Sequence, residues 1–165
     1  MSIIKLDSSF INYGNAVGKK EFEGPLGSLF DMHDTSDRFG QKTWEAAESE
    51  MQRMALSYAM RKAKVQTEDV DVMFAGDLLN QCVGSAYGLL SYDIPYLGLY
   101  GACSTCTESL LLSSALLQDE KFKIGAAVTS SHNSAAERQF RTPLEYGGQR
   151  TPTAQWTVTG CGGII

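Results

Sequence analysis

The sequence lacks the long apolar run that a membrane-spanning helix needs. No uninterrupted apolar stretch approaches the roughly 18 residues required to cross a bilayer. The first residues, Met1 to Asp7, have neither the basic start nor the long apolar core of a secretory signal. We therefore expect the chain to be made and kept in the cytoplasm, with any membrane attachment supplied by a partner.

Positive charge and cysteine are also scarce. The chain has 14 Lys and Arg against 19 Asp and Glu, a formal net charge of −5, and no basic run of five or more residues. This balance argues against a nucleic-acid surface and against attraction to anionic lipid headgroups. Four cysteines are too few for a disulfide framework at this length, so we expect them as thiols in a reducing compartment.

What is present is the pattern of a single α/β domain. The chain has 165 residues, 43% of them hydrophobic and 20% charged, which suffices for one buried core. Apolar strands and amphipathic helices alternate as β-α-β-α-β-α-β-β, which predicts a mixed sheet with helices on both faces. The expected strands span 9–17, 70–75, 96–100, 123–129 and 154–165, the helices span 43–64, 80–90 and 104–117, and long loops span 24–40 and 131–153.

Two of the helices carry further signals. Thr43 is a good N-cap for the first long helix, and its Met and aromatic stripe is expected to be core. The helix over 104–117 is apolar over most of its surface, which predicts that it is buried.

The most informative segment is the turn around Cys103. A short apolar strand runs through Gly101 and Ala102 into a helix, and in α/β proteins such turns face the crevice where ligands bind. A helix start carries partial positive charge and unpaired N–H groups, which favour a thiolate. Cys103 is therefore a candidate nucleophile; the alternative is a small buried thiol where strand and helix pack closely.

Several strings resemble one family closely, in order, from about residue 20 to the end. They are Gly24-Pro-Leu-Gly-Ser-Leu-Phe30, Ala75-Gly-Asp-Leu-Leu-Asn-Gln81, Gly101-Ala-Cys-Ser-Thr105, Thr129-Ser-Ser-His-Asn133, Ala136-Glu-Arg-Gln-Phe-Arg141, Glu145-Tyr-Gly-Gly-Gln149 and Thr157-Val-Thr-Gly160. Together they resemble the stage V sporulation protein AD family of the thiolase-like superfamily. The resemblance implies that residues 1–165 form the N-terminal half-domain of a thiolase-like fold, with the second half absent from this chain.

The resemblance also implies a function. Cys103 holds the position of the thiolase nucleophile, but the residues that assist condensation belong to the second half, so we expect no catalysis. The expected role is binding of dipicolinic acid, alone or as its calcium chelate, for uptake into the developing spore. The protein is expected to lie peripherally on the spore inner membrane, held by other stage V sporulation membrane proteins of the same operon. The full-length form is expected to be a homodimer, and no cofactor is expected.

Several side chains are candidates for binding that diacid. Asp77 follows a buried strand, and Asn80 lies just beyond it, so both are candidates to line the crevice that Cys103 faces. Asp77 could equally cap the helix that starts near Asn80. His132 follows the strand over 123–129 and is a further candidate by the same edge argument.

The two arginines of the 131–153 segment are the candidates for carboxylate binding. Arg138 and Arg141 are spaced i, i+3 and would act together if their stretch is helical, and the planar guanidinium suits bidentate capture. Tyr146 or Phe140 could stack on the ligand ring. The alternative is a local salt-bridge network in which Glu137 and the arginines hold the loop in place.

Three other functions remain open at this stage. An acyl-transferring enzyme would use Cys103 as its nucleophile, and a thiol–disulfide oxidoreductase would use Cys103 with Cys106. A metal site from these two thiols, His132 and Cys161 has suitable residue types, but a structural zinc site usually shows two close ligand pairs and only one exists. We therefore expect no metal, and His33 is expected to be a solvated histidine.

Overall fold

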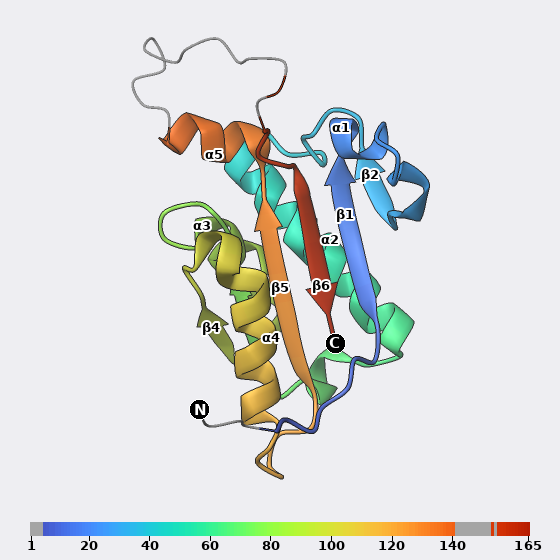
Figure 1. Cartoon of the computed structure of the whole chain (residues 1–165), viewed down its shortest axis with the longest axis vertical. Coiled ribbons are helices and arrows are strands. Elements are labelled where there is room, and N and C mark those ends of the chain that lie inside the picture. The colour runs from blue at the N-terminus through green and yellow to red at the C-terminus, as the bar shows by residue number, and fades with distance from the viewer. Residues whose placement is uncertain (1–4, 141–152, 154) are drawn as a thin grey trace.

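The computed structural model describes residues 5–140, 153 and 155–165, which form one six-stranded sheet with helices on both faces (Figure 1). The strands are β1 (Tyr13–Gly18), β2 (Met32–Asp34), β3 (Val72–Gly76), β4 (Tyr96–Gly98), β5 (Gly125–Ser131) and β6 (Gly160–Ile164). The α-helices are α1 (Lys19–Phe22), α2 (Trp44–Ala63), α3 (Val83–Gly88), α4 (Thr105–Leu116) and α5 (Asn133–Phe140). Short 3₁₀ turns are η1 (Gly27–Leu29), η2 (Thr67–Asp69), η3 (Leu90–Tyr92) and η4 (Ala102–Ser104).

The sheet has the order β2-β1-β6-β5-β3-β4 and is mixed, as predicted. Strand β3 pairs in parallel with β4 and β5, and β1 pairs in parallel with β2. Strand β6 lies antiparallel between β1 and β5. All five predicted strands and all three predicted helices are present, with their ends shifted by a few residues.

Two predicted loops contain regular structure, so those predictions were wrong in part. The loop predicted over 24–40 contains η1 and the edge strand β2, which pairs with β1 over only three residues. The loop predicted over 131–153 begins with α5, whose sequence includes the helix formers Ala135, Ala136 and Glu137. Of that predicted loop, residues 141–152 lie outside the described part of the chain.

Helix α2 is held at both ends by the local signals in its sequence. The Thr43 hydroxyl accepts a hydrogen bond from the Ala46 amide, 3.2 Å away, and Lys64 adopts a left-handed conformation at the C-terminal end. The helix buries small residues and methionines against β1, β6 and β5. A Cβ on Gly14 would lie 2.4 Å from the Ala55 carbonyl oxygen, so the strand and helix pack at backbone contact.

Helix α4 packs differently from the prediction. Its buried residues are Thr105, Ser109 and Ser113, spaced i, i+4, i+8. Leu111 and Leu112 are exposed, Leu111 by 56%, and the other two leucines are half-buried. Gly125 explains why small residues of α4 face the sheet. A Cβ at this position would lie 2.3 Å from the Ser113 hydroxyl oxygen, so the two elements approach too closely for larger side chains. Helix and sheet therefore meet through small residues, and the prediction of a buried, apolar helix was wrong for its outer surface.

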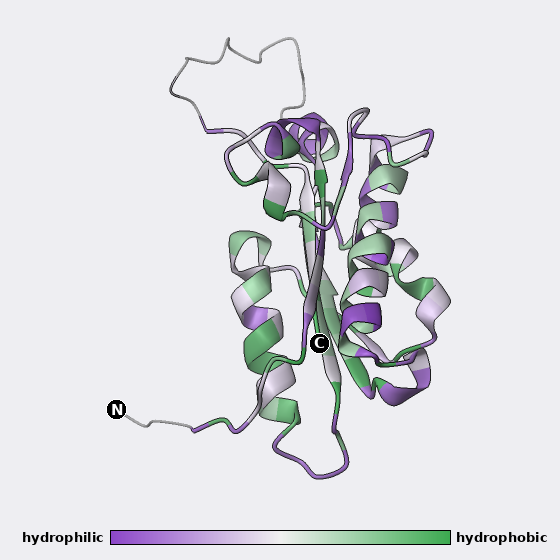
Figure 2. Cartoon of the chain, turned by 90° about the vertical axis from the view of Figure 1, so that its right-hand side faces the viewer, coloured by the Kyte–Doolittle hydropathy of each residue, from purple (hydrophilic) through white to green (hydrophobic). Residues whose placement is uncertain are grey.

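The two faces of the sheet are covered unequally. Figure 2 shows the sheet nearly edge-on between α4 and α2, and the larger hydrophobic core lies on the α2 side. The α4 side has a small cluster around Val72, Phe74 and Leu99. Helix α4 crosses β5 and β3 and leaves the outer face of β6 uncovered. Among the described residues, a Cβ on Gly162 would have no neighbour within 4 Å.

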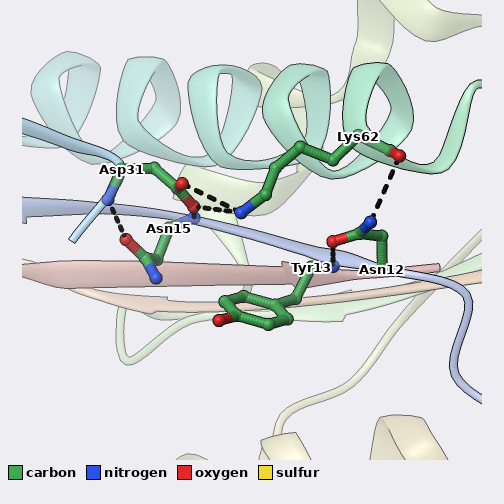
Figure 3. A network of polar contacts seen from close by, with 5 residues as sticks. All are labelled: Asn12, Tyr13, Asn15, Asp31 and Lys62. Carbon is green, nitrogen blue, oxygen red and sulfur yellow. Dashed lines mark hydrogen bonds and ion pairs between the residues drawn. The ribbon is translucent and has the colours of Figure 1, made fainter. Parts of the chain in front are cut away.

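At the β2 edge, a polar network joins three segments (Figure 3). The Lys62 ammonium contacts both carboxylate oxygens of Asp31, at 2.9 and 3.0 Å. Asp31 and Asn15 also exchange hydrogen bonds, since each side chain accepts one from the other residue's backbone N–H. The Asn12 amide donates to the Lys62 carbonyl. These contacts fix the chain leading into β2 against β1 and the end of α2.

Candidate functional site

The turn between β4 and α4 presents Cys103 at the surface. Ala102 has φ 49°, a left-handed conformation that a non-glycine residue adopts at a cost of roughly 1–2 kcal/mol. The end of β3 packs closely beneath this turn, because a Cβ on Gly76 would lie 2.1 Å from the Leu99 carbonyl oxygen and 2.7 Å from the Thr105 methyl group. The turn is thus held against β3, and both Cys103 and Cys106 are exposed thiols.

Both cysteines line an open pocket of about 490 Å³ on the uncovered side of the sheet. This volume lies within the usual range for small-molecule sites. Its floor is formed by β5 and β6, one wall by the start of α4, and the other by the segment that leads into β6. The lining residues are Leu78, Ala102, Cys103, Cys106, Ser109, Ala127, Thr129, Ser130, Ser131, Trp156, Thr157, Val158, Gly160, Cys161, Gly162 and Ile164.

The aromatic wall of the pocket is Trp156, which the sequence analysis did not single out. The indole is half-exposed, and the Lys20 ammonium lies 3.4 Å from its ring centroid. Lys20 is not itself a lining residue, so the wall is a flat apolar surface with a positive charge against the indole. The sequence signal for it was weak, because a lone tryptophan after the 131–153 segment gives no indication of which strand edge it faces.

The rest of the pocket lining is mainly apolar, with a few hydroxyl groups. Thr129 and Ser131 come from β5, and Thr157 follows Trp156 along the facing wall. The Ser131 hydroxyl donates to the Val158 carbonyl at 2.7 Å, which links the floor to that wall. The Thr157 hydroxyl donates to the Glu137 carboxylate at 3.2 Å. The wall is thus held by side chains of β5 and α5.

Asp77 caps the start of α3, as the alternative prediction for this residue had it. The side chain is buried, and its two carboxylate oxygens accept hydrogen bonds from the Leu79 amide and from the amide and hydroxyl of Ser85. Asp77 therefore orients the loop after β3 and the start of α3, and it does not line the pocket. Asn80 is exposed and lies outside the pocket as well, and its backbone N–H donates to the Gln139 side-chain oxygen at 3.2 Å.

His132 is fully buried and also does not line the pocket. Its Nδ1 lies 3.4 Å from the Ala135 amide, which donates to it, so Nε2 carries the proton and donates to the Asp37 carbonyl at 2.8 Å. Burial lowers the pKa of this imidazole. The residue caps α5 and packs against Trp44, 5.2 Å between ring centroids. The other histidine, His33, stacks on Phe22 with ring centroids 3.5 Å apart.

Arg138 is ion-paired with Glu45 of α2 and does not line the pocket. The alternative prediction was a local network of Glu137 with the arginines. The structure instead pairs Arg138 with Glu45 of α2, so a salt bridge holds this segment but joins it to another helix. Phe140, at the end of α5, is exposed and lies outside the pocket lining. Arg141 and Tyr146, the other candidates on this segment, lie outside the described residues.

Behind the floor of the pocket, a polar cluster is buried on the α2 side. The Ser130 hydroxyl donates to Glu48 at 2.8 Å, and the Gln52 amide donates to Ser130 at 2.6 Å and to Ser85 at 3.0 Å. Burial raises the pKa of Glu48 to about 8, assisted by the charge of Asp77. Glu48 is therefore mostly a neutral acid at pH 7 in the folded protein.

Two other cavities are less suited to binding a small molecule. One of about 50 Å³ at the other end of α4, beside Phe10 and Leu117, holds at most a few water molecules. A groove of about 410 Å³ lies between α2 and α3, but its charged residues Glu50 and Arg53 already pair with each other. In the part of the chain that the structure describes, no group of three or more His, Cys, Asp or Glu is placed to hold a metal ion.

Sequence comparison gives one consistent result. A family model described as stage V sporulation protein AD matches residues 2–165. Stage V sporulation protein AD of Bacillus subtilis (strain 168) is 46% identical over 157 residues, covering 94% of this chain and 46% of that protein. The chain thus spans about half the length of this curated relative.

Solved structures of low sequence identity share the fold. The 3-oxoacyl-[acyl-carrier-protein] synthase III of Aquifex aeolicus VF5 superposes with a TM-score of 0.60 at 15% identity, covering 94% of this chain and 52% of that one. The corresponding synthase III of Xanthomonas oryzae gives a TM-score of 0.58 at 12% identity, covering 94% of this chain and 54% of that one. The fold is therefore thiolase-like, as the sequence resemblance implied.

Proposed function

Because the chain belongs to the stage V sporulation protein AD family, whose name places its members in sporulation, we propose that it serves there as a non-catalytic binding protein. Its ligand is a small aromatic diacid, dipicolinic acid, held in the pocket beside Cys103. The family membership supports the sporulation role, and the chemistry of the pocket supports the ligand class.

The observation that carries the ligand proposal is the composition of the pocket wall. Dipicolinate is a flat ring that bears two carboxylates, so it needs an apolar plane, hydrogen-bond donors and positive charge. Trp156 supplies the plane, and the hydroxyl of Thr129 is placed on the floor. The charge comes from Lys20, which lies against the indole and is not a lining residue of the pocket. Stacking on an aromatic face contributes about 0.5–1.5 kcal/mol beyond the area buried. This arrangement replaces Arg138 and Phe140 of the sequence prediction with Lys20 and Trp156.

The non-catalytic role is proposed for this half of the fold, which places no histidine beside Cys103. Acyl transfer through a cysteine requires a base or a hydrogen-bond donor beside the thiol and the developing oxyanion. The chain has two histidines, and neither His33 nor His132 lines the pocket of Cys103. Both side chains are instead engaged, one stacked on Phe22 and the other bonded to the Asp37 carbonyl.

The remaining expectations are part of the same proposal. Residues 1–165 act as the N-terminal half-domain, the full-length form is a homodimer, and the protein lies peripherally on the spore inner membrane with other stage V sporulation membrane proteins. In the described residues, no helix combines the length and apolar character needed to cross a membrane. The uncovered face beside α4 is available for a further half-domain or a partner.

The chain's two tryptophans provide a direct test. In a Trp44→Phe variant, Trp156 is the sole tryptophan emitter, and added dipicolinate should quench its fluorescence in a saturable way. In the matched Trp156→Leu variant the emission comes from Trp44, and quenching should be lost. Calorimetry should show binding weakened by about tenfold in Trp156→Leu, which corresponds to roughly 1.4 kcal/mol.

Two results would contradict the proposal. One is saturable quenching of Trp44 without quenching of Trp156, which would place the ligand elsewhere. The other is a thioester on Cys103 after incubation with an acyl-CoA, seen by intact mass and turned over on adding an acceptor, which would make the chain an acyltransferase. Titrations with and without calcium decide whether the free diacid or its chelate is the ligand.

A further inference from the structure

The four cysteines of the chain fall into two pairs with opposite environments. Cys82 and Cys161 are buried, and burial raises the pKa of both thiols. The Cys82 thiol donates a hydrogen bond to the Leu99 carbonyl. Cys103 and Cys106 are exposed and line the same pocket. Cys161 also lines this pocket but is buried, so only the second pair is exposed to a solute.

The exposed pair lies one helical turn apart. Cys103 is in the 3₁₀ turn η4 and Cys106 is in the first turn of α4. Side chains spaced i, i+3 along a helix have Cβ atoms about 5–6 Å apart, and a disulfide needs Cβ atoms roughly 3.5–4.5 Å apart. Closing a bond between these two thiols therefore requires side-chain rotation and an adjustment of the η4 backbone that brings the two Cβ atoms closer by about 1–2 Å.

Both thiols border the same pocket, although only Cys106 belongs to α4. Thr105, Ser109 and Ser113 are its buried residues and face the sheet. Cys103 and Cys106 instead border the pocket together with Ser109. The binding role proposed above gives Cys106 no task, so the pair is a feature that the diacid pocket does not explain.

We propose that Cys103 and Cys106 form a dithiol modification site that undergoes exchange with a low-molecular-weight disulfide. The thiolate of one cysteine attacks a sulfur of the small disulfide and releases one small thiolate, which leaves a mixed disulfide on the protein. The second cysteine then attacks the protein sulfur of that mixed disulfide and releases the second small thiol. The protein loses two hydrogens, and the small disulfide gains them.

The second step is favoured because it occurs within one chain. Two groups held a single helical turn apart meet at an effective concentration far above that of a dilute solute. The mixed disulfide should therefore be short-lived in the native chain. The closed form removes both thiols from the wall of the pocket, whatever the pocket binds, so the site does not depend on the proposed ligand.

Reaction of the reduced, folded chain with oxidised glutathione tests the proposal. Intact mass should show the loss of two hydrogens with no retained glutathione, and peptide mapping should place the new bond between Cys103 and Cys106. Cys103→Ser and Cys106→Ser are matched controls at exposed positions, and each should instead retain one glutathione. A colorimetric thiol count should give two rapidly reacting thiols in the folded chain and four in denaturant.

A trivalent arsenical, phenylarsine oxide, provides an independent measure of thiol proximity. It joins two thiols with release of one water, so the native chain should bind one equivalent and both single serine variants should lose this binding. The proposal is overturned if the native chain accumulates glutathione on both cysteines without an internal bond. It is also overturned if the bond involves Cys82 or Cys161, or if the folded thiols do not react.

Discussion

The two faces of the sheet differ in how completely they are covered. On the α2 face, the helix packs at backbone contact with β1 and β6, and the buried side chains include the hydrogen-bonded cluster of Glu48, Gln52 and Ser130. On the α4 face, the helix contacts the sheet through small hydroxyl residues, exposes leucines, and borders an open pocket.

This difference assigns stability mainly to the α2 face of the sheet and ligand binding to the α4 face. The residues that sequence reasoning assigned to ligand binding at the strand ends, Asp77 and His132, are buried and hold backbone groups. The exposed thiols, the tryptophan and the hydroxyls gather on the uncovered face. We therefore expect substitutions on the α2 face to affect folding, and substitutions on the α4 face to affect binding and association.

The largest expected effect comes from adding a methyl group on the closed face. Gly14→Ala places a Cβ 2.4 Å from the Ala55 carbonyl oxygen and 2.5 Å from the Ala59 amide nitrogen. The backbone must shift to relieve this contact, so we expect the free energy of unfolding to fall by about 3 kcal/mol or more. Urea unfolding followed by circular dichroism measures the change.

Gly162→Ala is the matched control on the open face. A Cβ at this position has no neighbour within 4 Å, so stability should change by less than about 0.5 kcal/mol. Equal losses for the two variants would show that the faces do not differ in the way described.

The next effect concerns pH and depends on Glu48. Its folded pKa is raised by burial from the ordinary value of 4.5 to about 8. Between these values the folded chain binds more protons than the unfolded chain, so this contribution to stability is complete below pH 4.5. It decreases as pH rises and is lost above about pH 8. The slope from this one group reaches at most about 1.4 kcal/mol per pH unit.

Glu48→Gln should remove that slope, since the amide keeps an oxygen to accept the Ser130 hydrogen bond and does not titrate. The variant should gain stability relative to the native chain as the pH increases toward 8. Glu68→Gln changes an exposed carboxyl and should retain the native slope. Parallel pH profiles for the native chain and Glu48→Gln would refute the assignment of Glu48 as a buried neutral acid.

The smallest effect on stability is expected at the exposed leucines of α4. Leu111→Gln should change the free energy of unfolding by less than about 0.5 kcal/mol, because 56% of this side chain is already exposed. It should, however, reduce self-association measured by light scattering, since exposed apolar surface drives contact between molecules. A monodisperse native chain would contradict the prediction of self-association. A large loss of stability in Leu111→Gln would mean that this face of α4 is buried against other residues.

Much of the fold could be predicted from sequence because its signals are local. The Thr43 cap and the spacing of buried residues identify α2, and the apolar strands identify the sheet. The orientation of α4 was mispredicted, because an apolar face was expected to pack on the sheet, whereas the buried row of this helix is Thr105, Ser109 and Ser113. Its orientation is instead fixed by Gly125, which admits only a small side chain opposite. Helix α5 was missed because its cap is His132, an unusual capping residue.

The candidate site was predictable only at its centre. Cys103 follows from the strand–glycine–helix pattern, and the structure places its thiol at the surface beside a pocket. Trp156 and Lys20 lie far apart in sequence and meet through the antiparallel return of β6 beside β1, a pairing that no local pattern encodes. Asp77 shows the opposite error. A carboxylate at the end of a strand predicted ligand binding, but in the structure it caps a helix.

The central claim is that the open face holds a small aromatic diacid beside the Cys103 turn. A crystal structure of the chain with dipicolinate tests this most directly. The account predicts ligand density stacked on Trp156, above the floor formed by β5 and β6, with a carboxylate near Lys20. Density at Arg138 and α5 instead, or an empty pocket at saturating ligand, would contradict it.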